Sequence, residues 1–152
     1  MIVRDARADE IAALARAVAD QPLLERYEIA GDRLATLLVE AHGRGDPLIV
    51  AEEGGRARGF AWFLPSGTLG AGGYLRLIAL EPGSEGHGLG AALLDELENR
   101  VAASSRHLFL LVSHWNTAAQ RFYSRRGYAE VGRLPAFVRP DTDELIFHKR
   151  LK

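Results

Sequence analysis

The stretch that decides the fold is Gly83-Ser84-Glu85-Gly86-His87-Gly88-Leu89-Gly90. It follows an apolar run over Tyr74–Leu80 and opens an amphipathic run over Leu89–Val101. This order predicts a strand, a glycine-rich turn and a helix. The first N–H groups of a helix have no partner within it, and the helix dipole favours negative charge there. Glycines let the backbone approach a ligand closely, so we expect a phosphate-containing molecule on this loop.

Several ligands fit such a loop when it is considered alone. Residues Gly86–Ala91 match the dinucleotide fingerprint G-x-G-x-x-G/A. However, the motif lies in mid-chain, residues 81–85 separate it from the strand, and the next apolar run ends in Ser113-His114-Trp115 rather than in an acid for ribose. No Lys-Ser/Thr pair follows the glycines, which excludes a P-loop. A turn without a ligand and a nucleotide-binding domain both stay open at this point.

The composition narrows the class of protein. The chain has 152 residues, of which 47% are hydrophobic and 26% charged, and its net charge is −1. The length favours a single domain over residues 1–152, and the charge argues against nucleic acid or a membrane surface as partner. The absence of cysteine excludes disulfides and thiolate-ligated zinc, and we expect no metal. With no signal-like or membrane-spanning apolar run, a soluble cytoplasmic protein is expected.

Hydrophobic periodicity predicts strands interleaved with helices. Asp9 is expected to cap the first helix, Pro22 to interrupt the chain after it, and Pro65–Gly73 to form a glycine-rich loop. This order predicts an α/β (α+β) three-layer domain, with a mixed sheet of six or seven strands and about four helices. The expected strands cover residues 2–4, 48–51, 59–64, 74–80, 108–112, 129–134 and 144–147, and the expected helices residues 10–20, 32–41, 89–101 and 116–126.

A second motif follows the loop at a set distance. Residues Asn116–Tyr128 read Asn-x-x-Ala-x-x-Phe-Tyr-x-x-x-Gly-Tyr. Together with the loop, this stretch resembles the GNAT superfamily of acyl-CoA-dependent N-acetyltransferases, whose pyrophosphate loop runs Gln/Arg-x-x-Gly-x-Gly/Ala. The resemblance covers about residues 48–152 well and the first helices only by order. It implies a mostly antiparallel twisted sheet, with acetyl-CoA as co-substrate. It also implies transfer of the acetyl group to a primary amine by direct attack in a ternary complex.

One residue departs from the family pattern. Glu85 stands where the family has Gln or Arg, and a carboxylate beside a pyrophosphate is repulsive, although exposure and salt reduce the cost. If the family's contacts here are backbone N–H groups, the loop still binds when the Glu85 side chain turns outward. The departure, with the lack of an obvious base, keeps a second hypothesis open: a non-catalytic acyl-CoA-binding or sensor module with the same fold.

The resemblance also implies a set of cofactor-binding residues. Backbone groups of Ile78, Ala79 and Leu80 would pair with pantetheine where strand 74–80 parts from strand 108–112, and N–H near Leu80 would stabilise the acetyl oxygen. Asn116 is expected to cap its helix and also to contact the pantetheine arm or nearby backbone. His87 is expected to face solvent, with a phosphate contact as the alternative. The remaining implied contacts are Glu85, Gly86, His87, Gly88, Leu89, Gly90, Ala91, Ala119 and Tyr123.

Tyr123 is the expected catalytic residue. It lies seven residues after Asn116, about two helical turns on, so both side chains face the same way. A phenol keeps its proton at neutral pH and, by the resemblance, would give it to the departing CoA thiolate. A purely structural hydroxyl is the alternative.

The acceptor side carries weaker signals. His114, Glu81 and Glu28 are candidate bases, but solvated or structural roles are the ordinary interpretation of each, and water-mediated deprotonation is equally open. Leu24 and Tyr27 fall where this family commonly shapes its acceptor pocket. The acceptor itself, a small amine or a peptide amine, is not indicated by any residue, and a homodimer through the final strands is left open.

Overall fold

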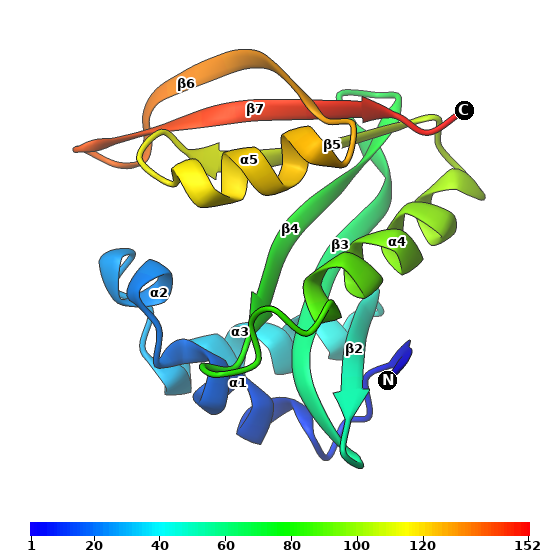
Figure 1. Ribbon diagram of the computed structural model, residues 1–152, viewed down its shortest axis with the longest axis vertical. Helices are drawn as coiled ribbons and strands as arrows, with labels where there is room; N and C mark the ends of the chain where they lie inside the picture. The colour runs from blue at the N-terminus through cyan, green and yellow to red at the C-terminus, as the bar shows by residue number, and fades with distance from the viewer. The chain divides into compact units, whose positions relative to one another are not determined.

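The computed structural model describes residues 1–152 and contains two compact units. The first unit comprises Met1–Phe63 and Leu77–Asn99, and the second comprises Leu64–Arg76 and Arg100–Lys152. The strands are β1 (Ile2–Asp5), β2 (Leu48–Glu53), β3 (Arg56–Thr68), β4 (Gly72–Leu80), β5 (His107–Ser113), β6 (Ala129–Arg139) and β7 (Thr142–Arg150). The helices are α1 (Ile11–Ala19), α2 (Pro22–Arg26), α3 (Gly31–Gly43), α4 (Leu89–Ala102) and α5 (Thr117–Arg125), as labelled in Figure 1.

The strands hydrogen-bond in the order β1-β2-β3-β4-β5-β7-β6. Strands β4 and β5 pair in parallel, whereas β1–β2, β2–β3, β5–β7 and β6–β7 pair antiparallel. The predicted mixed, mostly antiparallel sheet is therefore confirmed, with seven strands and with one helix more than the four expected. None of the helices is long and apolar enough to cross a membrane. The expectation of a single domain over residues 1–152 stays a prediction.

The first unit is built around the strands β2 and β3. Helices α1 and α3 pack against Val50, Phe60 and Trp62, which belong to one continuous core cluster. Because side chains alternate across a strand, the neighbouring Ile49 and Phe63 face the opposite side, and they are buried as well. That side is left to α4, whose leucines at positions 89, 93, 94 and 97 are fully buried. Packing of α4 against the second apolar face of β2 and β3 thus determines the position of the helix start and of the glycine loop before it.

The second unit combines β5, β6 and β7 with helix α5, which Figure 1 draws next to β5. Tyr123 of α5 packs over Phe147 of β7, with ring centroids 6.5 Å apart. The last strand in the order, β6, keeps large apolar side chains in solvent, with Phe137 59% and Val131 58% exposed. The homodimer left open by the sequence stays a prediction.

The predicted loop over residues 65–73 is wrong. Strand β3 continues to Thr68 and β4 begins at Gly72, so only three residues form the turn. A Cβ on Gly73 would lie 2.6 Å from Val101 Cγ1, and one on Gly72 would lie 2.8 Å from the His107 carbonyl oxygen. These glycines permit close packing inside a strand rather than marking a flexible loop.

Two further boundaries differ from the prediction. Helix α1 begins after Glu10, which caps it without a side-chain hydrogen bond, so Asp9 is not the cap. Glu10 instead forms ion pairs with Arg4 and accepts a hydrogen bond from the Arg7 N–H. Pro22 does not simply interrupt the chain, because it opens the short helix α2, where a proline at the first position costs no hydrogen bond.

Candidate functional site

The glycine loop presents a row of unpaired backbone donors. The N–H groups of Gly86, Gly88, Leu89, Gly90 and Ala91 donate no hydrogen bond within the protein, and the first regular helical bond of α4 runs from Ala92 N–H to the Gly88 oxygen. Gly86 and Gly88 have φ values of +80° and +79°, and a Cβ on either would meet nothing within 4 Å. Such a row of donors over open space at a helix N-terminus suits a phosphate group.

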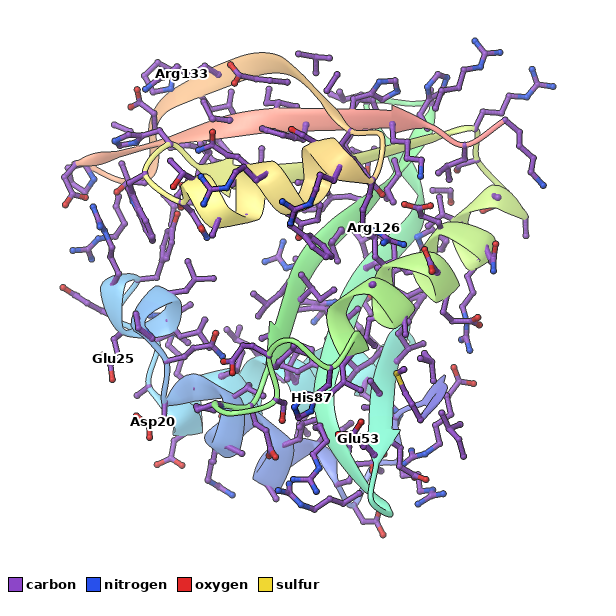
Figure 2. The ribbon with its side chains drawn as sticks, viewed as in Figure 1. Asp20, Glu25, Glu53, His87, Arg126 and Arg133 are labelled. Atoms are coloured by element: carbon purple, nitrogen blue, oxygen red, sulfur yellow. The ribbon has the colours of Figure 1, made fainter.

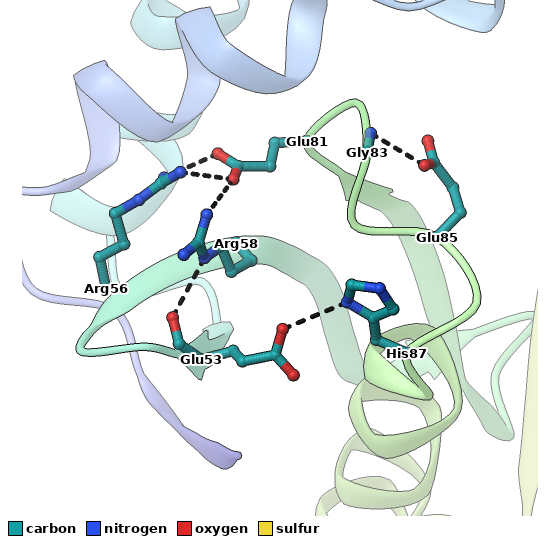
Figure 3. A network of polar contacts seen from close by, with 7 residues as sticks. All are labelled: Glu53, Arg56, Arg58, Glu81, Gly83, Glu85 and His87. Carbon is teal, nitrogen blue, oxygen red and sulfur yellow. Dashed lines mark hydrogen bonds and ion pairs between the residues drawn. The ribbon is translucent and has the colours of Figure 1, made fainter.

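Glu85 and His87, the two exposed polar side chains of the loop, contact different partners (Figure 3). Glu85 reaches back and accepts a hydrogen bond from the Gly83 N–H at 2.9 Å. The His87 Nδ1 atom lies 3.2 Å from Glu53 Oε1 of β2, and both side chains are about half exposed. Figure 2 shows the same approach of His87 and Glu53 in the whole molecule. Neither side chain hydrogen-bonds to the unpaired N–H groups, so the backbone of the loop is left open to a ligand.

The residue where β4 enters the loop is anchored by charge. Glu81 is 8% exposed and accepts two hydrogen bonds from Arg56, at 2.7 and 2.8 Å, and one from Arg58, at 2.9 Å. The hydrogen bonds from Arg56 and then from Arg58 hold the pKa of the Glu81 carboxyl below its ordinary value. A carboxylate held in this way accepts protons poorly, so Glu81 is a structural anchor of the loop and a weak candidate for the base.

The end of strand β4, residues 76–80, has no strand partner on the side of β5. Its parallel ladder with β5 ends at the pair Leu75–Leu110, although β4 itself continues to Leu80. The Glu81 N–H donates to the Arg58 oxygen of β3. Because successive residues of a strand turn their backbone groups to alternate sides, Leu80 turns its own N–H and C=O to the edge away from β3, as does Ile78. These are the groups to which the resemblance assigns the pantetheine, while Ala79 is buried.

Helix α5 begins as its sequence predicts. The Asn116 side chain accepts a hydrogen bond from the Ala119 N–H at 3.2 Å, which confirms Asn116 as the N-cap. Gly127 follows the helix with a φ of +92°, the left-handed conformation expected of a residue just beyond a helix end. Asn116 and Ala119 are both partly exposed. Their role toward the cofactor stays a prediction.

Tyr123 lies in an aromatic environment. It is 7% exposed, and its ring centroid lies 5.2 Å from that of Phe122 and 5.6 Å from that of Tyr128. Its hydroxyl makes no hydrogen bond within the protein. Burial raises the pKa of the Tyr123 phenol well above its ordinary value. The phenol therefore stays protonated at neutral pH, as a proton donor must.

The other candidate bases have distinct surroundings. The Asp143 N–H donates to His114 Nδ1 at 3.0 Å, and the same nitrogen lies 3.3 Å from the Asp143 oxygen. Glu28 has a φ of +58° and lines a cavity of 460 Å³ with Asp20 and Glu25 beside α1 and α2. Figure 2 labels Asp20 and Glu25 there. Glu28 belongs to the first unit and His114 to the second.

The two predicted acceptor residues differ in burial. Leu24 is 1% exposed and belongs to the core cluster of α1 and α3, which is the environment of a packing residue. Tyr27 ends α2 and is partly exposed. Their assignment to an acceptor pocket stays a prediction.

Gln21 is not among the candidate site residues identified from the sequence, but the structure places its side chain at the end of β4. Gln21 lies between α1 and α2, and its side-chain Nε2 donates to the Leu80 oxygen at 3.0 Å and to the Val18 oxygen. A glutamine before a proline matches no motif. Its partner Leu80 is 59 residues away in the chain, so no local pattern could have indicated the contact.

Comparison with known proteins gives a consistent result. The model of the acetyltransferase (GNAT) family matches residues 9–128. An uncharacterized N-acetyltransferase of Methanocaldococcus jannaschii is 34% identical over 103 residues, which are 66% of this chain and 64% of that protein. The chain thus spans somewhat less than two thirds of the length of that relative.

Solved structures share the whole fold. A GNAT-family protein from Desulfovibrio desulfuricans is 25% identical, with a TM-score of 0.79 over 99% of both chains. The protein yncA from Salmonella typhimurium, solved with its cofactor acetyl-CoA, is 20% identical, with a TM-score of 0.75 over 100% of this chain and 94% of its own.

Proposed function

The chain belongs to the GNAT family of acetyltransferases, and we propose that it transfers an acetyl group from acetyl-CoA to a primary amine. The observation that carries this proposal is the row of five unpaired N–H groups from Gly86 to Ala91 at the start of α4. A pyrophosphate accepts hydrogen bonds through several oxygens, and it satisfies such donors without needing a basic side chain. The acetyl-CoA bound to a structural neighbour supports the choice of ligand.

The residues present fit this co-substrate. The loop binds the pyrophosphate through its backbone. The open edge offers the N–H and C=O of Ile78 and the N–H of Leu80 to the pantetheine arm, since the Leu80 C=O accepts from Gln21. The Leu80 N–H stabilises the acetyl oxygen as negative charge develops on it. Glu85 does not obstruct binding, because its carboxylate is turned to Gly83.

The chemistry is a direct transfer. The lone pair of a neutral amine attacks the thioester carbon, so a C–N bond forms, the C–S bond breaks, and its electron pair leaves on sulfur. The nitrogen loses one proton to water, and Tyr123 gives its phenolic proton to the thiolate. Burial makes this phenol a weaker acid than tyrosine in water. The transfer therefore depends on the thiolate being desolvated too, because low polarity raises the proton affinity of both anions.

A binding and turnover experiment tests the proposal. Calorimetry with acetyl-CoA, and with NAD and ATP as competitors, is expected to show affinity for acetyl-CoA alone. Release of CoA thiol is then followed with benzylamine, putrescine, kanamycin and a short peptide with a free N-terminus. Turnover with at least one amine supports the transferase. Binding of acetyl-CoA without turnover of any amine would instead favour the sensor module, and affinity for NAD or ATP alone would overturn both.

A further inference from the structure

Gln21 holds a side-chain amide at the open edge of β4. Its Nε2 atom donates to two backbone carbonyls, those of Val18 and Leu80. Carbonyl oxygens only accept hydrogen bonds, so the atom that faces both of them must be the NH₂ group. Both N–H bonds of the amide are thereby used, and the orientation of the carboxamide is fixed. Gln21, Val18 and Leu80 all belong to the first unit.

The oxygen of the same amide has no hydrogen-bond partner. Gln21 Oε1 makes no hydrogen bond within the protein and is not among its fully buried polar atoms. An amide oxygen accepts up to two hydrogen bonds and cannot donate. A partly buried acceptor with a fixed direction and no protein partner is suited to a donor that arrives with a ligand.

The position of this oxygen relative to the proposed chemistry follows from Leu80. The N–H and C=O groups of one strand residue point to the same side. Gln21 occupies the Leu80 C=O, while the Leu80 N–H on the same edge is the group that would hold the acetyl oxygen. Oε1 shares its carbon with the Nε2 atom that contacts Leu80. The free oxygen Oε1 therefore lies on the same carboxamide that contacts Leu80, the residue whose N–H would hold the thioester carbonyl.

We propose that Gln21 Oε1 accepts a hydrogen bond from an N–H of the attacking amine and so directs its lone pair at the thioester carbon. This inference rests on the proposed acetyl transfer. Gln21 removes no proton, because a carboxamide does not titrate in this range. It contacts the neutral amine, and the proton released after attack leaves to water. The site thus selects acceptors whose reacting nitrogen carries an N–H, and it does so with a neutral group.

Two variants separate the oxygen from the rest of the side chain. Gln21→Met keeps a similar length and removes the whole amide. Gln21→Lys keeps a donor for the carbonyls of Val18 and Leu80 but has no acceptor. Gln120→Met is the matched control, because Gln120 Nε2 also donates to two carbonyls, those of Ser113 and His114, at 3.3 and 3.0 Å. Melting temperatures establish that each variant is folded.

The probe is hydroxylamine, a small nitrogen nucleophile, with the uncatalysed rate subtracted. Both Gln21 variants are expected to lower kcat/KM for hydroxylamine about 3- to 10-fold, the loss of one hydrogen bond, while the Kd for acetyl-CoA changes less than about twofold. Gln120→Met is expected to leave kcat/KM for hydroxylamine unchanged. The loss is expected to be constant across the pH profile, since no base is removed.

The outcomes separate the two proposals. A wild-type rate for Gln21→Lys would show that only the anchoring donor matters, and it would overturn the role of Oε1 while acetyl transfer stands. A loss that varies with pH would overturn it as well, because it would indicate an effect on a titrating base. A wild-type protein that binds no acetyl-CoA, or that acetylates neither hydroxylamine nor any amine of the first panel, would overturn the proposed function and this inference together.

Discussion

The glycine loop offers backbone donors to solvent, whereas helix α5 offers one buried side chain. In the loop, five N–H groups are unpaired, and the Glu85 and His87 side chains contact other partners. In α5, Tyr123 is enclosed by the rings of Phe122, Tyr128 and Phe147. The loop thus presents main-chain donors, and Tyr123 presents a phenol that burial keeps protonated.

This difference decides how each region responds to substitution. Main-chain binding depends on backbone conformation and on the local charge, and it tolerates changes of side chains that point away. A buried phenol depends on the identity of a single atom and on the low polarity around it. Substitutions in the loop should therefore change affinity, and substitutions at Tyr123 should change turnover.

The largest effect is expected for Gly88→Asp. Glycine adopts a φ of +79° without strain, whereas aspartate does so only occasionally, and the new carboxylate would lie among the donors proposed for the pyrophosphate. Strain and like-charge repulsion together are expected to cost about 4 kcal/mol of binding, or roughly 1,000-fold in the Kd for acetyl-CoA. Calorimetry measures this loss.

Gly70→Asp is the matched control for strain. Gly70 has a φ of +75° and open space around it, but it lies in the β3–β4 turn. Its variant should lose some stability and keep its affinity for acetyl-CoA. Normal affinity in a folded Gly88→Asp protein would remove the pyrophosphate from this loop.

The second largest effect is expected for Tyr123→Phe. Loss of the hydroxyl removes the proposed proton donor and leaves the ring packing intact, so kcat is expected to fall about 100-fold, at the low end for general acid catalysis. The Kd for acetyl-CoA should not change, since binding is assigned to the loop. Steady-state kinetics and calorimetry on the same preparation separate the two quantities. An unchanged kcat would leave Tyr123 only a structural role.

The loop and the helix could be predicted from the sequence because their determinants are local. The turn needs its own glycines, and Asn116 caps the helix three residues before its partner Ala119. The same holds for Gly127, whose positive φ is required by the helix end that it follows. Tyr123 was identified through a motif within one helix, and its orientation toward the same side as Asn116 stays a prediction.

Other parts could not be predicted because their determinants are distant in the chain. Gly72 and Gly73 are required by His107 and Val101, which approach them only after folding, and a glycine-rich stretch ordinarily indicates a loop. Glu81 became an anchor rather than a base through Arg56 and Arg58 of another strand. The identity of a residue and of its neighbours in the chain does not indicate such distant partners.

A smaller effect, on stability, is expected for Glu81→Gln. The exchange removes the charge from hydrogen bonds to Arg56 and Arg58 and is expected to cost about 2 kcal/mol of unfolding free energy at neutral pH. Because the folded state lowers the Glu81 pKa, the stabilisation is complete above the ordinary value of 4.5 and is lost as the pH falls through the folded value.

Urea unfolding at neutral pH and at about pH 3 measures both parts of this prediction. The wild type should lose more stability on acidification than the variant does. An equal loss of unfolding free energy on acidification in the two proteins would mean that Glu81 does not stabilise the folded state through its charge. Affinity for acetyl-CoA serves as the second readout. It should fall only if the weaker hydrogen bonds of residue 81 to Arg56 and Arg58 disturb the loop.

The smallest effect is expected for Glu85→Gln, the change that restores the family's residue. The Glu85 carboxylate is turned to the Gly83 N–H, at 2.9 Å, and is exposed to solvent, so its repulsion of a bound pyrophosphate is screened. The Kd for acetyl-CoA should improve by no more than about threefold at physiological salt, and the gain should shrink further as salt is added. A much larger gain would show that the side chain faces the ligand after all. The loop would then owe its affinity to side-chain charge as well as to its backbone, and the contrast with Tyr123 would be weaker than the structure indicates.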